Sequence, residues 1–413
     1  MMVGSFGEAA ISSVSLVDSI SHLLVVIFSA FATGGSVVVS QYLGRKDEKS
    51  AMTATRNLMY LTFFAAGILL VVLLPFHRQI LTLVYGNLER DVLKYASEYF
   101  VPLIISYFFL GFYSSLNAIS RSEGKSARTL YVSLVMNGIN IVGNATLVVG
   151  LGLGPMGAGI STMLSRLFGC SAMLLLMRRK TEVLSLRNLL AGPVDKRILK
   201  TIASVAIPQG LESSIFNVGK LLVATLAASL GTSAIAINSV AWNFNSFSNI
   251  IGQGLNLATI TIIGQCRGAD NFRDIKYYTK VIFGIFFVAS SLVILPLVAL
   301  TRPIIFIYNI SPESMEEAVP LCWAVLLSGL FIWPWSFTTP SILKACGDVK
   351  FILFVNVFSM WAFRVLFSNI LIKGFGFGLW GLWLGTFMDW IVRSVVYLIR
   401  YHKGKWRQVR LIC

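Results

Sequence analysis

Hydrophobic residues lie along the chain in long runs that are separated by short charged or turn-rich segments. A helix needs about 20 apolar residues to cross the hydrocarbon core of a bilayer, and eleven runs reach that length. They cover residues 9–39, 53–75, 96–118, 129–151, 157–177, 201–229, 233–263, 279–301, 319–341, 351–373 and 377–399. The pattern predicts an all-α integral membrane protein with eleven spans.

Composition and charge support this interpretation and indicate an orientation. Only 13% of the residues are charged, against about 25% in soluble chains. Of the 34 Lys and Arg residues, 25 fall in one alternating set of connections and five in the other. Cytoplasmic loops carry such an excess, so we expect the C-terminus on the cytoplasmic side of the plasma (inner) membrane. The net charge of +16 then requires no nucleic-acid partner.

An internal repeat appears when the chain is aligned with itself at the offset that carries Gly7 onto Gly231. The first members are Gly7, Ala10, Ile11, Ser15, Gln41, Gly44, Gly152, Gly154 and Gly157, and their identical counterparts are Gly231, Ala234, Ile235, Ser239, Gln265, Gly268, Gly376, Gly378 and Gly381. The span 201–229 maps almost entirely before residue 1, so the first half is expected to lack its opening helix. Two complete halves of six spans would be parallel repeats, related by an axis along the membrane normal.

The repeat predicts four regions. They are an N-terminal lobe of five spans at 1–180, a cytoplasmic linker at 181–200, a C-terminal lobe of six spans at 201–400, and a basic cytoplasmic tail at 401–413. Whether the missing helix is a real loss or reflects the choice of start codon stays open.

Several motifs recur at matching places in both halves. The first half has SQYLGRKDEKSA, SRSEGKSA and NGINIVGNATLVVGLGLGPMGAGIST, and the second has IGQCRGADNFRD, KACGDVK and DWIVRSVVYLIRYHKGKW. Together these segments resemble the multidrug and toxic compound extrusion (MATE) transporters. The resemblance implies two six-helix lobes arranged as a V. It also implies export of organic, often cationic compounds in exchange for Na⁺ or H⁺, without another cofactor, and we expect a monomer.

Ionisable side chains inside the spans are the first candidates for function, because each costs about 2.5–3.5 kcal/mol to insert. Glu212 lies four residues after Pro208, near the expected middle of its helix. It could bind a proton or neutralise a substrate; alternatively, it is a structural carboxylate satisfied by Lys220. We assign Lys220, Arg364 and Asn137 to the substrate cavity together with Glu212.

Three asparagines form a polar stripe on one span. Asn137, Asn140 and Asn144 have helical spacing, and lipid would not tolerate such a stripe, so we expect it to face the lobe interior. The resemblance implies that Asn140 and Thr162 belong to a cation site in which Asn144 stands where relatives have Asp. The alternative is hydrogen bonding between helices, at about 0.6 kcal/mol for each pair.

Two further acids have a basic residue four positions later. Asp18 and His22 could relay protons, which makes Asp18 a coupling candidate, or they could form a local hydrogen bond facing water. Asp389 and Arg393 are expected to be a structural pair, with Arg393 extending toward the cytoplasmic surface. Arg166 is expected to be a similar surface anchor.

Other patterns exclude some classes of protein. The five cysteines are dispersed, so neither a metal site nor a disulfide framework is indicated. The glycines at 152–159 join two hydrophobic spans and follow no strand, which excludes a dinucleotide-binding loop. We therefore expect a transporter and not an enzyme. The alternatives are a lipid-linked oligosaccharide flippase of the same superfamily, or a truncated membrane scaffold that does not transport.

Overall fold

The structure, a computed structural model, describes residues 2–86, 88–178, 184, 192–308 and 310–412. These residues form helices and contain no strand, which confirms the all-α prediction. The α-helices are α1 Glu8–Gly44, α2 Glu48–Tyr85, α3 Arg90–Ser122, α4 Ser126–Asn144, α5 Gly154–Met177, α6 Lys196–Ala228, α7 Thr232–Gly268, α8 Phe272–Ala299, α9 Thr301–Phe306, α10 Pro312–Phe331, α11 Trp333–Ala345, α12 Val349–Ser359, α13 Ser368–Lys373 and α14 Gly378–His402.

All eleven predicted spans coincide with helical segments in the described part of the chain. Ten of these segments are long and apolar enough to cross a membrane. The eleventh predicted span is α7, which is 37 residues long but carries amides such as Asn245, Asn249 and Gln253 among its apolar residues. Two spans contain a π-helix, at Ala145–Gly150 after α4 and at Met360–Phe367 between α12 and α13.

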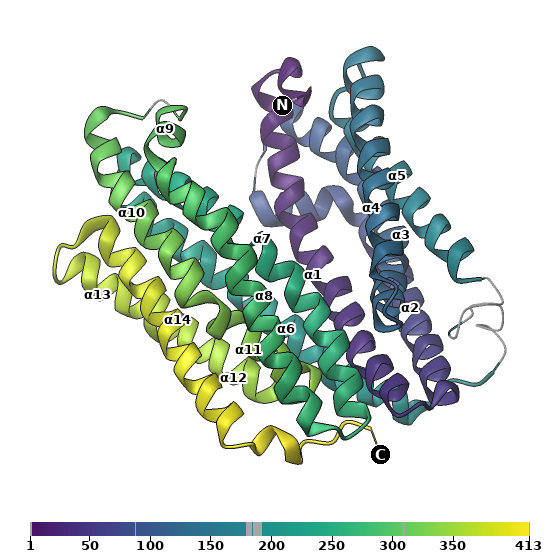
Figure 1. Cartoon of the computed structure of the whole chain (residues 1–413). Helices are drawn as coiled ribbons and strands as arrows, with labels where there is room; N and C mark the ends of the chain where they lie inside the picture. Colours follow the sequence, from purple (N-terminus) through teal and green to yellow (C-terminus); the bar gives the residue numbers. More distant parts are fainter. Residues whose placement is uncertain (1, 87, 179–183, 185–191, 309, 413) are drawn as a thin grey trace. The chain divides into compact units, whose positions relative to one another are not determined.

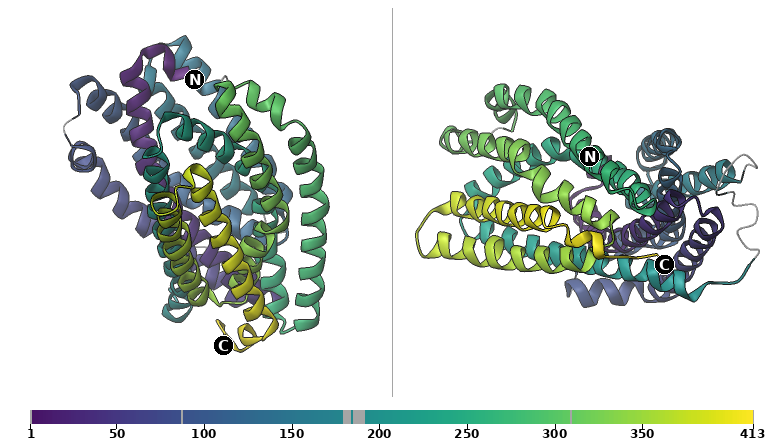
Figure 2. Two further views of the ribbon diagram at one scale, coloured as in Figure 1. Left: turned by 90° about the vertical axis from the view of Figure 1, so that its left-hand side faces the viewer. Right: turned by 60° about the horizontal axis from the view of Figure 1, so that its bottom comes forward.

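The chain divides into two compact units, Met1–Gly210 and Leu211–Cys413, with the boundary inside α6. In the first unit α1 packs along α2 and α3, and α5 packs against α3 and α4 (Figure 1). In the second unit α7 packs against α8, α10 and α11, and α14 lies beside α11 and α13 (Figure 2). Half of the predicted linker at 181–200 lies outside the described residues, and α6 already begins at Lys196.

The helix boundaries reproduce the sequence repeat. Helices α1 and α7 have the same length, and both of their ends correspond at the offset that carries Gly7 onto Gly231. The turn after each one contains a residue with positive φ, Lys46 at 60° and Asp270 at 51°. The next residue, Asp47 or Asn271, then accepts a hydrogen bond at the N-terminus of the following helix. The recurring motifs around Gly44 and Gly268 therefore encode the same turn twice.

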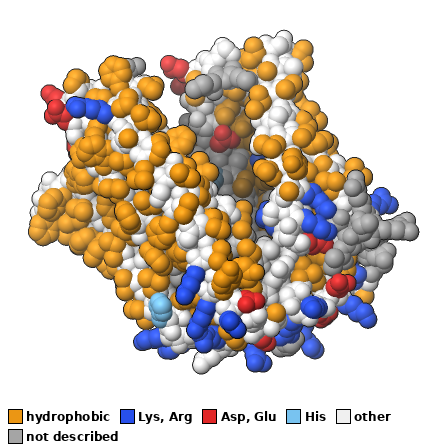
Figure 3. Space-filling model, in the orientation of Figure 1, with side chains coloured by type: hydrophobic (Ala, Val, Ile, Leu, Met, Phe, Trp, Pro, Cys, Tyr) orange, Lys and Arg blue, Asp and Glu red, His pale blue; other side chains and the backbone are white. Residues whose placement is uncertain are grey.

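Surface chemistry follows the membrane pattern within each unit. Hydrophobic side chains cover the sides of the helices, and Lys and Arg side chains gather at their lower ends in Figure 3. Asp47 belongs to this polar end, where hydrogen bonds from Ser50 hold the pKa of its carboxyl below the usual range. The positive end is the one expected to face the cytoplasm, and the orientation itself stays a prediction.

Candidate functional site

A buried cluster of charges lies in the middle of the second unit. Asp389 of α14 pairs with Arg393 one turn later at 2.7 Å and with Arg364 of the π-helix at 2.9 Å. Ser359 donates to the other carboxylate oxygen at 2.6 Å. Asp389 is 0% exposed and both arginines are 1% exposed. One carboxylate thus neutralises only one of two buried guanidinium groups, and the cluster carries a net positive charge.

This cluster is connected to Glu212 through Asn356 of α12. The Asn356 amide nitrogen donates to Glu212 Oε1 at 2.6 Å. Its oxygen accepts hydrogen bonds from Arg393 at 3.3 Å and from the Tyr397 hydroxyl at 2.6 Å. On the opposite side of Glu212, Lys344 Nζ lies 3.6 Å from Oε2. A continuous chain of polar contacts therefore runs from Lys344 through Glu212 and Asn356 to the buried cluster.

One expectation about Glu212 was wrong in its geometry. Its basic neighbour is Lys344 and not Lys220. The reason is that Lys344 comes from the last turn of α11, so residue spacing within α6 could not indicate this partner. Glu212 itself lies at the middle of α6, which runs Lys196–Ala228, as expected. It is therefore a paired carboxylate half-way along its helix.

Arg393 also departs from expectation. Its pair with Asp389 is confirmed, but the side chain is fully buried and does not extend to the surface. The physical reason is that its two terminal nitrogens donate to Asn356 and Asp389 inside the unit, which favours the buried position, although its Nε has no partner within the described structure.

A cavity of about 360 Å³ adjoins the cluster. It is lined by Phe216, Lys220, Trp242, Asn245, Ser246, Asn249, Gln253, Asn256, Trp333, Phe337, Arg364 and Trp390. Two of the predicted cavity residues, Lys220 and Arg364, are thus brought together, and both have their cationic groups 5.2 Å from the centre of the Phe216 ring. Glu212 is not among the described lining residues, which include no Asp or Glu. The walls are aromatic and amide-bearing, and their charge is positive.

The first unit brings three of its predicted site residues together. The Asn144 amide donates to Asn140 at 3.1 Å, and the Asn140 amide donates to Thr162 on α5 at 3.3 Å. Asn137 is exposed, so the expectation that the whole stripe faces the interior was wrong. The reason is that α4 packs mainly on α5 and has Val132 as its one buried residue. The Asn140 cluster is neutral, and it matches the interhelical alternative as well as a cation site.

Asp18 and Arg166 have partners that sequence spacing did not indicate. Asp18 accepts a hydrogen bond from the Tyr99 hydroxyl on α3 at 2.9 Å, whereas His22 is exposed one turn away. Arg166 donates to Ser106 at 2.7 Å and lies over the Tyr107 ring, so it is not a surface anchor. Both side chains therefore join α3 to its neighbours inside the first unit.

The family follows from a comparison with known proteins. The model of the MatE family matches residues 1–146 and 208–370, which is one match in each half of the repeat. The chain belongs to the MatE family. The expected resemblance is thereby confirmed, and this MatE protein is a membrane transporter and not an enzyme.

Curated relatives of this MatE chain include multidrug transporters. It is 25% identical over 99% of its length to the uncharacterized transporter YisQ of Bacillus subtilis, with 90% of that protein covered. It is 24% identical over 98% of its length to the probable multidrug resistance protein NorM of Thermotoga maritima, with 87% covered. Multidrug efflux relatives of this kind support a drug efflux transporter.

Solved structures agree on the fold. An outward-facing multidrug resistance MATE transporter superposes with a TM-score of 0.91 at 18% identity, covering 99% of this chain and 91% of that one. A MATE transporter in a bent conformation gives a TM-score of 0.89 at 19% identity, covering 97% and 89%. At these identities the likeness supports the MatE fold alone.

Sequence reasoning missed Lys344, Asn356 and Tyr397. Lys344 falls in the connection between the predicted spans 319–341 and 351–373, and the two others lie on spans between hydrophobic neighbours. A buried amide flanked by apolar residues was the one available signal for Asn356, because such a group needs partners inside a membrane protein.

Proposed function

We propose that this MatE transporter exports amphipathic organic compounds in exchange for protons, with Glu212 as the proton-binding residue. The observation that carries the proposal is the chain of contacts that leads from Glu212 through Asn356 and Arg393 to Asp389 and Arg364. Arg364 lines the cavity of the second unit, so the two ends of this chain are the site of protonation and the site of binding.

Protonation of Glu212 would change the contacts at each step. The neutral acid no longer attracts Lys344, and it binds the Asn356 amide less strongly, because hydrogen bonds to a carboxylate are about twice as strong as neutral ones. Asn356 also accepts from Arg393, which shares Asp389 with Arg364. Inside a low-dielectric unit such a network transmits a change of charge effectively. Exchange follows if the two protonation states favour different arrangements around the cavity.

The first unit is a weaker candidate for coupling through Na⁺. A hard cation favours several oxygen ligands, preferably carboxylates, and Asn140, Asn144 and Thr162 supply only neutral ones that already hydrogen-bond to one another. Asp18 is engaged by Tyr99. We therefore infer that H⁺ is the coupling ion.

The test is uptake of a fluorescent drug into inverted vesicles that contain the whole chain. In vesicles held at zero membrane voltage, we expect uptake to require an acidic lumen, to stop when a protonophore removes the pH gradient, and to be accompanied by proton release from the lumen. Uptake driven by a Na⁺ gradient alone at equal pH would contradict proton coupling.

The charge of the cavity bears on the substrate. The resemblance implies cationic compounds, but the cavity has Lys220 and Arg364 on its wall and no carboxylate among its described lining residues. Lys220 has no carboxylate partner within ion-pair distance in the described part of the chain. We infer that the preferred compounds carry an anionic group beside a planar apolar part, the latter fitting against Trp242, Trp333 and Trp390. A phosphate-bearing lipid-linked load is the second candidate that this charge favours.

Replacement of Lys220 tests this inference. We expect Lys220→Met to raise the KM for anionic aromatic compounds about 10-fold or more, because a hydrogen bond to a charged group is lost, and to leave neutral compounds unaffected. The measurement is uptake of a matched carboxylate and carboxamide pair. Ser246→Ala, at a neutral lining position, is the control. If Lys220→Met transported the carboxylate compound with the same KM as the unmodified protein, an anion preference would be refuted.

A further inference from the structure

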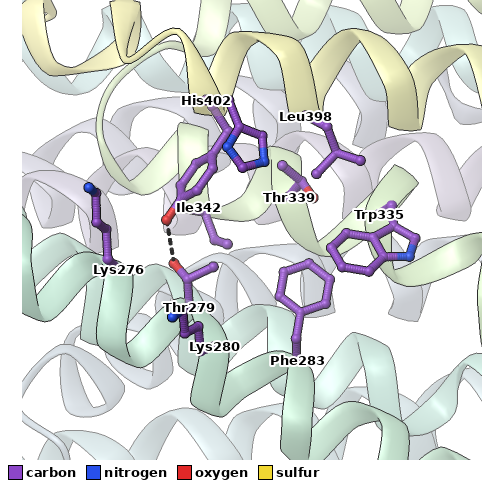
Figure 4. A pocket seen from close by; sticks show the side chains of 10 residues that line it. Lys276, Thr279, Lys280, Phe283, Trp335, Thr339, Ile342, Leu398 and His402 are labelled. Carbon is purple, nitrogen blue, oxygen red and sulfur yellow. Dashed lines mark hydrogen bonds between the residues drawn. The ribbon is translucent and has the colours of Figure 1, made fainter.

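The second unit contains a second cavity, which shares no lining residue with the cavity beside Arg364. Its volume is about 480 Å³, and it is enclosed by residues of α8, α11 and α14 (Figure 4). Phe283 and Trp335 form its apolar wall, with their rings stacked 4.4 Å apart, and Ile342 and Leu398 complete it. This groove, defined by these residues, suits an aliphatic chain.

Three basic side chains border the groove. Lys276 and Lys280 are one helical turn apart on α8, and His402 ends α14. All three are exposed. In the described ranges no carboxylate lies within ion-pair distance of either lysine. The border therefore offers two uncompensated ammonium groups at one end of an apolar groove.

One polar atom inside the groove lacks a partner. The Thr339 hydroxyl is buried, at 2% residue exposure, and has no hydrogen bond within the described structure. Figure 4 shows it among the lining side chains, between Trp335 and Ile342 in the chain. By contrast, Thr279 accepts from the Tyr401 hydroxyl at 3.3 Å. Because a buried hydroxyl without a partner is costly, Thr339 offers the groove a polar atom that a ligand oxygen or water can satisfy.

The helix surfaces beside the groove indicate that its ligand comes from the lipid bilayer. On α8 the exposed residues Ile285 and Val288 continue toward the middle of the span, and on α14 Val395 and Ile399 do the same. An exposed apolar helix face in a membrane protein contacts lipid. The basic border lies at the end that carries the excess of Lys and Arg, where anionic lipids of the cytoplasmic leaflet attract positive charge.

We propose that this groove is a binding site for an anionic phospholipid of the cytoplasmic leaflet. An acyl chain lies against Phe283, Trp335 and Leu398, and the headgroup phosphate is held by Lys276 and Lys280, with His402 beside them. The ligand is a lipid that stays with the transporter, distinct from the exported compound. The proposal does not depend on the function of Glu212.

The repeat provides an internal comparison. At its offset the first-half counterparts of Lys276, Lys280 and Phe283 are Met52, Arg56 and Met59. The end of α11 at Ala345 matches the end of α3 at Ser122, an offset one residue smaller, so the counterpart of Trp335 is Phe112. The first half thus keeps one basic and one aromatic residue at the matching places and lacks one of each. The combination of two lysines with two stacked rings is therefore a feature of the second unit.

Native mass spectrometry of the purified full-length chain tests the site. We expect the protein to retain phosphatidylglycerol in preference to phosphatidylcholine. Lys276→Gln combined with Lys280→Gln should weaken retention on the order of 10-fold, because each lysine contributes to the attraction of an anionic headgroup. Arg273→Gln combined with Lys350→Gln removes the same charge from exposed positions outside the groove, and it should leave retention unchanged.

Three outcomes would overturn the proposal. The first is equal retention of phosphatidylcholine, which would mean that the apolar wall alone binds lipid. The second is displacement of the lipid by millimolar inorganic phosphate, which would make the site one for free phosphate. The third is an equal loss of retention in both double variants, which would indicate a general effect of surface charge.

Discussion

Glu212→Gln should reduce proton-linked export to the level of vesicles without the protein, while the variant still accumulates in the membrane. Glutamine has nearly the same shape, and its oxygen can still accept the hydrogen bond from Asn356 that Glu212 receives at 2.6 Å. It has no titratable charge, and its amide group faces the Lys344 ammonium in place of a carboxylate oxygen. The expected loss therefore concerns protonation rather than packing. Uptake in inverted vesicles with an acidic lumen measures it.

The controls separate coupling from general damage. Glu313→Gln makes the same chemical change at an exposed position in the first turn of α10, and it should transport normally. Asn144→Ala, which removes one hydrogen bond of the first unit, should have a smaller effect through packing alone. Normal proton-linked export by Glu212→Gln would return the coupling site to the first unit.

Asp389→Asn should lower the free energy of unfolding by about 3–5 kcal/mol, the usual cost of removing one partner from a buried ion pair. Arg364 and Arg393 would remain fully buried, and the one carboxylate between them would be gone. The two guanidinium groups, which both contact the same carboxylate oxygen in the unmodified protein, then repel one another in a medium of low dielectric. A thermal melt of the purified protein in detergent measures the change.

An apolar replacement of the whole cluster distinguishes charge from packing. Replacement of Asp389 by Leu together with Arg364→Met and Arg393→Met removes every uncompensated charge, and such exchanges are often neutral or stabilising. We expect this triple variant to recover most of the stability lost by Asp389→Asn and to fail in transport. A triple variant that melts as low as the single one would show that the cluster stabilises the fold through its geometry and not through charge balance.

The fold could be predicted largely from the sequence because its signals are local or repetitive. Span lengths follow from hydrophobic runs, and the internal repeat recurs in the boundaries of α1 and α7. The turns at Lys46 and Asp270 also arise from short motifs. Such features can be predicted without knowing which faces of the helices pack against one another.

The candidate site was only partly predictable for the opposite reason. The pair of Asp389 and Arg393 lies within one helix, and its spacing was sufficient to predict it. The partners of Glu212 are on α11 and α12, far from it along the chain, and which faces of these helices meet is decided by packing. Arg393 was expected at the surface because its own span offers only Asp389 as a partner. The second partner, Asn356, lies on another helix, and the sequence does not show that the two meet.

If the positive cavity of the second unit carries anions, the membrane voltage contributes to the driving force for export. A bound anion neutralises one of the fixed charges of Lys220 and Arg364, and it leaves the cell in the direction that an inside-negative voltage favours. An entering proton moves in the direction that the same voltage favours. Each charge gains about 2.3 kcal/mol per 100 mV, so exchange of one proton for one monovalent anion would draw on the membrane voltage twice. For such a compound, accumulation outside the cell would persist even where the two sides have the same pH.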